Sequence, residues 1–167
     1  MRAFIFLFRF EDIEGDADLQ AELINPFLTS SVQVIETIIQ VKPTVGKLHM
    51  KEIQFADNYV WLKIRIHGQV EKEILFGFPD RMAMNMVSTM LGGYVVTEVD
   101  DMCRSAVAEL GNMISGNAST MLYHNGITVD ITPPKLVEDT TIDTGKKAVS
   151  IPLRVDRIGE FDINIIV

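Results

Sequence analysis

Four residues of one expected helix lie on the same side of it and form a candidate reactive centre: Ser105, Glu109, Asn112 and Gly116. The helix is expected over Asp101–Asn125, and at about 100° per residue the other three residues fall within about 40° of Ser105. A glutamate and an asparagine three positions apart project from a helix together. The amide can accept a hydrogen bond from water and donate another, and because it is neutral it is not repelled by a phosphoryl group. Phosphoryl transfer depends mainly on positioning and on charge neutralisation, so such a pair is suited to orienting an attacking water molecule.

The opposite side of this helix is apolar and is expected to face a core. Glycine inside a helix costs about 0.8–1 kcal/mol relative to alanine, so Gly116 on the solvent side indicates a place where another surface comes close. Glutamate and asparagine are also common on helices that simply face water, so the pattern alone leaves a functional and a structural interpretation open. The expected apolar stripe consists of Cys103, Ala106, Val107, Leu110, Met113, Ile114 and Met121.

The pattern Ser-x3-Glu-x2-Asn, followed about twenty residues later by a proline, resembles the signature of the CheC/CheX/FliY family of chemotaxis phosphatases. Here the prolines are Pro133 and Pro134, at a spacing slightly shorter than usual. The resemblance covers residues 21–167, and a single Glu/Asn motif most resembles the CheX members. Three flanking segments match as well: Asn25-Pro26-Phe27-Leu28, Phe76-Gly77-Phe78-Pro79 and Met90-Leu91-Gly92.

The resemblance implies an α+β fold, with a mostly antiparallel six-stranded sheet, long helices packed on it and an internal pseudo-two-fold symmetry. The earlier long helix offers Glu36 for a second motif but has Ile39 where the asparagine would stand. The resemblance also implies a homodimer whose sheets join through their strands.

The activity implied by the resemblance is hydrolysis of the aspartyl phosphate of CheY, a chemotaxis response regulator. Asn112 would orient the attacking water, Glu109 would pair with the regulator's active-site lysine, and Ser105 and Gly116 would border the contact. The regulator would bring its own Mg²⁺, so this chain would bind no cofactor or metal. An alternative is a non-catalytic module of the same fold that binds a response regulator or a flagellar-switch part, and a third is a sensory protein with a ligand groove.

Composition excludes several other classes. The chain has 167 residues, of which 47% are hydrophobic and 23% charged, as expected for one globular domain. The net charge of −8 argues against nucleic acid and anionic membranes as partners. The single cysteine, Cys103, lies on the apolar stripe, which indicates a buried thiol and fits a reducing cytoplasm. The three histidines show no metal-ligand spacing, and no glycine-rich phosphate loop or Ser/His/Asp set is present.

The elements that position the helix are expected on both sides of it. Residues 1–20 are interpreted as an appended segment of unknown role, whose Phe-rich start would add to a sheet edge if ordered. Asn25 is expected to cap a helix with Pro26 in its first turn. Residues 47–55, 59–67 and 73–78 are expected to form an antiparallel meander, followed by a helix from Pro79-Asp80 to Gly92-Gly93 and by Asp100 as the next N-cap. The later segments are strands at 127–131, 147–155 and 161–167, with the two prolines at a strand end or edge and a polar loop at 138–146.

Overall fold

The computed structural model describes residues 17–138 and 144–167, with side chains described from residue 21. Three helices and an eight-stranded sheet make up this part of the chain. The helices are α1 (Ala17–Ile39), α2 (Asp80–Met90) and α3 (Asp101–His124). The strands are β1 (Thr44–Val45), β2 (His49–Glu52), β3 (Tyr59–Gly68), β4 (Lys72–Pro79), β5 (Val129–Ile131), β6 (Lys135–Leu136), β7 (Lys147–Val155) and β8 (Gly159–Ile166).

The strand order is β1-β7-β8-β4-β3-β5, with β2 also paired to β7 and β6 also paired to β3, and all these pairs are antiparallel. The expected α+β class is therefore confirmed, but the expected count of six strands was too low. At each edge of the sheet, two short strands pair with the same long strand: β1 and β2 with β7, and β5 and β6 with β3. One edge is interrupted between Val45 and His49, and the other at Pro133 and Pro134, which cannot donate to a ladder.

The order of elements repeats along the chain. A long helix, a divided edge strand and a long hairpin occur as α1, β1–β2, β3–β4 and again as α3, β5–β6, β7–β8. If each strand is replaced by its counterpart in the other set, the strand order reads the same from the opposite edge of the sheet. The β4–β8 pair lies at the centre of this arrangement. This arrangement is the one that an internal pseudo-two-fold symmetry would produce, and the symmetry itself stays a prediction.

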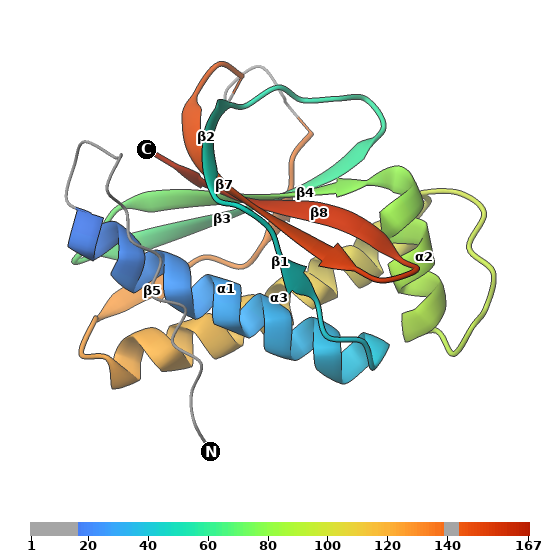
Figure 1. Ribbon diagram of the computed structural model, residues 1–167, viewed down its shortest axis with the longest axis horizontal. Helices are drawn as coiled ribbons and strands as arrows, with labels where there is room; N and C mark the ends of the chain where they lie inside the picture. Colours follow the sequence, from blue (N-terminus) through green and yellow to red (C-terminus); the bar gives the residue numbers. More distant parts are fainter. Residues whose placement is uncertain (1–16, 139–143) are drawn as a thin grey trace.

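The long helices α1 and α3 lie side by side and antiparallel against one face of the sheet, with α2 at one end (Figure 1). The strands alternate, so every second side chain points toward the helices. On β3 these are Val60, Leu62, Ile64 and Ile66, all with no exposed surface. They form one hydrophobic core with the buried faces of the three helices.

The first helix begins earlier than expected. Instead of starting at Asn25 with Pro26 in its first turn, α1 begins at Ala17 and contains Pro26 in its interior. A proline inside a helix costs about 3 kcal/mol. The neighbouring side chains of Leu23, Ile24 and Phe27 are each at most 1% exposed, and complete burial of such a side chain contributes about 1.5–3 kcal/mol. Burial of the flanking turns therefore outweighs the effect of the proline. The expected edge strand near the N-terminus lies outside the described residues.

The expected meander of three strands was wrong for its first member. Strands β3 and β4 form the predicted hairpin, but β2 pairs with β7 at the opposite side of the sheet. The segment that follows β2 crosses the face away from the helices, where Ile53 packs with Trp61, Leu75 and Ala148 in a second, smaller core. The turn at Asp57 and Asn58 thus ends this crossing segment and is not the tight turn of a hairpin.

The packing of the Trp61 ring in this second core requires a glycine directly beneath the ring. Gly77 lies opposite Trp61 in the β3–β4 register, and a Cβ atom at position 77 would lie 2.6 Å from Cζ3 of the indole ring. Tyr59 stacks on the ring and Phe55 meets its edge, with centroid distances of 5.4 and 4.9 Å. The ring is therefore held on three sides, and residue 77 must lack a side chain.

We predict that Gly77→Ala lowers the free energy of unfolding by about 1–3 kcal/mol, the usual effect of overpacking a filled core. Gly116→Ala is the matched control, because a Cβ atom there would meet nothing within 4 Å. The control is expected to be as stable as the wild type or more stable by up to about 1 kcal/mol. Urea denaturation compares the two, and a Gly77→Ala protein of wild-type stability would show that the indole ring is free to shift.

Candidate functional site

The start of α3 is fixed by the side chain of Asp100. Its Oδ1 accepts a hydrogen bond of 2.8 Å from the backbone N–H of Cys103, which confirms the expected N-cap. The helix ends at His124, with Asn125 at the C-cap and Gly126 at φ 79°. A left-handed glycine after the last turn is the usual way to end a helix. Both ends of α3 are thus defined by local residues.

One face of α3 is buried against the sheet and α1. The helix approaches the sheet closely at Gly111, where a Cβ atom would lie 3.0 Å from Cδ1 of Leu62 and 3.1 Å from Cγ of Pro134. Pro134 lies between β5 and β6, so the downstream proline packs directly beneath the helix. The buried residues of α3 are Cys103, Val107, Leu110, Gly111, Ile114, Ser115, Ala118 and Leu122.

The opposite face carries the four residues singled out in the sequence. Ser105, Glu109, Asn112 and Gly116 are all exposed, as predicted. Nδ2 of Asn112 donates a hydrogen bond of 3.3 Å to Oε2 of Glu109. The structure therefore brings the carboxylate and the amide into contact, with Ser105 one turn before them and Gly116 one turn after.

This contact determines how the two groups are presented. A carboxylate only accepts hydrogen bonds, so the amide must direct its NH₂ group toward Glu109. The carbonyl oxygen Oδ1 of Asn112 then remains as an acceptor, and the second carboxylate oxygen of Glu109 can receive a donor from another molecule. The pair thus presents one neutral acceptor and one charged acceptor side by side. This face of α3 can hold a water molecule and a cationic group at neighbouring positions.

Met113 departs from the expected apolar stripe. It is 39% exposed, and two further large apolar side chains of α3, Met102 and Tyr123, are 45% and 73% exposed. At about 100° per residue, all three lie within about 80° of Ser105 and so on the polar side of the helix. The angle of Met113 was available from the sequence, but its apolar character placed it in the stripe. Two residues that were missed, Gly111 and Ser115, take part in the buried face instead.

Other kinds of chemistry find little support in the described part of the chain. Cys103 is fully buried, and this burial, together with the nearby Asp100 carboxylate, raises the pKa of the thiol. A buried thiol with a raised pKa is a poor nucleophile. Within residues 17–138 and 144–167, no three His, Cys, Asp or Glu side chains are grouped so that they could hold a metal ion. None of the described helices has the length and apolar character needed to cross a membrane.

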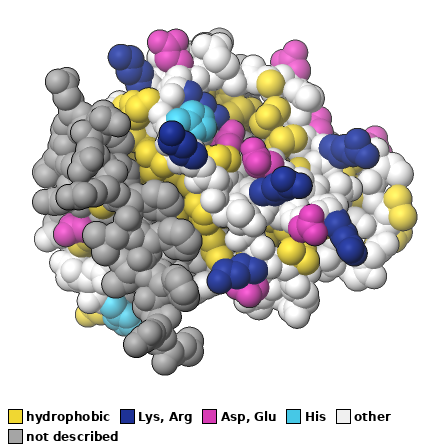
Figure 2. All heavy atoms as spheres, in the orientation of Figure 1, with side chains coloured by type: hydrophobic (Ala, Val, Ile, Leu, Met, Phe, Trp, Pro, Cys, Tyr) yellow, Lys and Arg dark blue, Asp and Glu magenta, His cyan; other side chains and the backbone are white. Residues whose placement is uncertain are grey.

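Charge on the visible surface is mixed. Among the coloured side chains of Figure 2, Lys and Arg are interspersed with Asp and Glu, and basic residues form no continuous patch on that face. Proteins that bind nucleic acid through its phosphates present a basic patch or stripe. The face shown, like the net charge of −8, gives no support to a nucleic-acid partner.

Comparison with known proteins gives consistent results. The family model described as chemotaxis phosphatase CheX matches residues 60–154. A CheY-P phosphatase CheX from Thermotoga maritima is 30% identical over 150 residues, covering 88% of this chain and 96% of that protein. The crystal structure of the chemotaxis protein CheX from Vibrio vulnificus is similar, with a TM-score of 0.74, 25% identity, and coverage of 87% of this chain and 98% of that chain. The CheX–CheY–BeF₃–Mg²⁺ complex from Borrelia burgdorferi has a TM-score of 0.71 at 27% identity, with coverage of 86% and 96%.

We predict that Asp100→Ala lowers the free energy of unfolding by about 0.5–2 kcal/mol, because the N–H of Cys103 loses its acceptor. Asp100→Asn keeps an oxygen in the same place and is expected to stay close to wild-type stability. Thermal and urea denaturation of the two variants give the comparison. Equal stability of both variants would show that the cap contributes nothing to the start of α3.

Proposed function

The chain belongs to the CheX family of chemotaxis phosphatases, and we propose that it hydrolyses the aspartyl phosphate of a CheY-like response regulator. The observation that carries this proposal is the exposed Glu109–Asn112 pair on α3, with its hydrogen bond of 3.3 Å. The relative from Thermotoga maritima is named a CheY-P phosphatase, and a similar CheX has been crystallised with CheY, BeF₃ and Mg²⁺. Beryllium fluoride on an aspartate stands in for the phosphoryl group of the substrate.

In the proposed reaction, water attacks phosphorus and the bond between phosphorus and the aspartyl oxygen breaks. The products are inorganic phosphate and the regulator's free carboxylate. Oδ1 of Asn112 accepts a hydrogen bond from the attacking water, which directs a lone pair of that water toward phosphorus. Because the amide is neutral, it adds no negative charge beside the phosphoryl oxygens.

Glu109 has two tasks in this proposal. One carboxylate oxygen accepts from Nδ2 of Asn112 and fixes the amide, as it does in the free chain. The other pairs with the regulator's active-site lysine and sets the orientation of the two proteins. Mg²⁺ is held by the regulator and neutralises charge on the phosphoryl group, and this chain contributes no metal ligand.

Ser105 and Gly116 border the contact. The space above Gly116 is open, since a Cβ atom there would meet nothing within 4 Å. Absence of a side chain lets the partner's surface approach the helix backbone. Insertion of a helix face into a cleft requires such close approach. We therefore assign both residues to partner contact and not to chemistry.

We place the reaction in the cytoplasm, because a reducing compartment fits the single buried thiol of Cys103.

Asn112→Ala is predicted to lower kcat on the phosphorylated regulator by on the order of 10²-fold and to leave KM nearly unchanged, because misplacing a reacting group has an effect of this size. Glu109→Ala is predicted to lower kcat and raise KM together, and added salt should weaken wild-type binding more than binding by this variant. Phosphate release in the presence of Mg²⁺ is the measurement.

Matched controls are Asn58→Ala and Glu52→Ala, which remove the same groups from exposed positions outside α3. Both are expected to keep wild-type kinetics. If the kcat of Asn112→Ala equalled that of the wild type, the water-orienting role assigned to Asn112 would be wrong. The non-catalytic binding module would then be the better description of the chain.

The homodimer implied by the family stays part of the proposal. We expect light scattering at micromolar concentration to give twice the 18.7 kDa mass of one chain, with the two sheets joined through strands. The mass of a single chain under these conditions would contradict the CheX-like assembly and favour a CheC-like monomer.

A further inference from the structure

Exposed apolar side chains share the solvent-facing side of α3 with the Glu109–Asn112 pair. Met102, Met113 and Tyr123 are the large hydrophobic residues of this helix that are exposed, and all three lie on the polar side. A helix that faced water alone would gain nothing from two methionines and a tyrosine there. Methionine and tyrosine are both enriched in the surfaces that partner proteins cover, relative to the rest of the protein surface.

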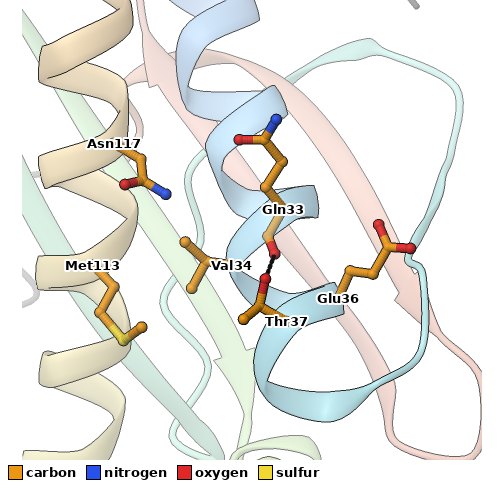
Figure 3. Close-up of a pocket in the computed structure, with 6 residues that line it drawn as sticks. All are labelled: Gln33, Val34, Glu36, Thr37, Met113 and Asn117. Atoms are coloured by element: carbon orange, nitrogen blue, oxygen red, sulfur yellow. Dashed lines mark hydrogen bonds between the residues drawn. The ribbon is translucent and has the colours of Figure 1, made fainter. Parts of the chain in front are cut away.

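Met113 also forms one wall of a groove between α3 and α1. The groove has a volume of about 400 Å³ and is lined by Gln33, Val34, Glu36, Thr37, Met113 and Asn117. Figure 3 shows Val34 pointing from α1 toward α3, with Met113 and Asn117 pointing back toward α1. Val34 is only 3% exposed, so it forms the floor of the groove. The lining therefore has an apolar base.

The upper part of the groove is polar but almost uncharged. The side-chain amides of Gln33 and Asn117 and the hydroxyl of Thr37 form its rim. The Thr37 hydroxyl donates a hydrogen bond of 2.8 Å to the backbone carbonyl of Gln33. Glu36 contributes the one carboxylate among the lining residues, and in Figure 3 it points away from α3 toward the outer edge. Among the described residues that line the groove there is no lysine or arginine. Its chemistry suits an apolar side chain with backbone groups around it and a cationic residue near the outer edge.

The position of the groove identifies its occupant. Met113 follows Asn112 directly and lies one turn after Glu109. A stable protein–protein interface buries about 800 Å² on each partner, which corresponds to a disc of about 16 Å radius. Since a helix rises about 1.5 Å per residue, Met113 and Asn117 lie about 2 and 8 Å from Asn112 along α3. A regulator seated on the Glu109–Asn112 pair must therefore cover the groove as well.

We propose that this groove receives an apolar side chain from the response regulator, next to its phosphorylation site, and that Met113 is the main contact. This inference rests on the proposed function, because it takes the regulator as the partner. The reactive groups of a phosphorylated regulator are the phosphoaspartate, its metal and the lysine, and these engage Glu109 and Asn112. The groove touches none of them, and so it selects among regulators without taking part in the reaction. Met113, Gln33, Thr37 and Asn117 are specificity-determining residues in this proposal.

The test compares kcat and KM for CheY-like regulators of the same organism, each phosphorylated with a small-molecule phosphodonor in Mg²⁺. Met113→Ala is expected to raise KM for the matching regulator by about 5- to 30-fold, which is the effect usual for loss of an anchoring side chain at an interface. The value of kcat is expected to stay unchanged. Asn117→Trp, which fills the groove, is expected to raise KM at least as much. Met50→Ala is the matched control, since Met50 is 45% exposed on β2, away from α3. Thermal denaturation verifies that each variant is folded.

Calorimetric binding of the regulator loaded with BeF₃ and Mg²⁺ separates the two proposals. Weaker binding by Met113→Ala supports the groove even if the wild type releases no phosphate, in which case the proposed function alone fails. A KM and a dissociation constant within about twofold of wild type for both groove variants would overturn the inference while the phosphatase activity stood. A change in the mass of Met113→Ala in light scattering, without a change in regulator binding, would assign the groove to a second copy of the chain and also overturn it.

Discussion

The close approach of α3 to the sheet is the constraint on which the rest of the structure depends. At Gly111 the helix backbone lies so near Leu62 and Pro134 that a single added methyl group would be in tight contact with both. This contact, with the burial of the side chains around it, fixes the rotation of α3 about its own axis. Once that rotation is fixed, Glu109 and Asn112 can point only to solvent. The exposed pair is therefore a consequence of how the opposite face packs.

The same arrangement explains how a reactive surface can be built without strain or buried charge. Glu109 and Asn112 remain in water in the free chain, so neither loses hydration when the protein folds. Their mutual hydrogen bond holds the amide in one orientation before any partner arrives. In the proposed complex, water is excluded only when the partner covers α3, and electrostatic interactions become stronger at that moment. The low-dielectric environment that the proposed reaction needs would thus be supplied by the complex.

The sequence predicted the features that depend on local residues. Asp100 as the N-cap and an end of the helix near Asn125 were both expected and delimit α3, and the angular positions of Glu109 and Asn112 follow from the helical period. Prediction from the sequence failed where contacts between segments far apart in the chain determine the structure. The pairing of β2 with β7 depends on residues about a hundred positions apart, and Pro26 remains inside α1 because the core buries its neighbours. Met113 was misplaced because residue type was given more weight than its angle on the helix, and the groove beside it requires α1, whose position no local pattern gives.

The most direct test of the central claim is the rate at which a phosphorylated CheY-like regulator loses phosphate when this chain is present at a small fraction of the regulator's concentration. The account predicts that catalytic amounts accelerate the release of inorganic phosphate from the entire regulator pool and that the acceleration requires Mg²⁺. Release no faster than that of the regulator alone, with the chain shown to be folded and to bind the regulator, would contradict the account.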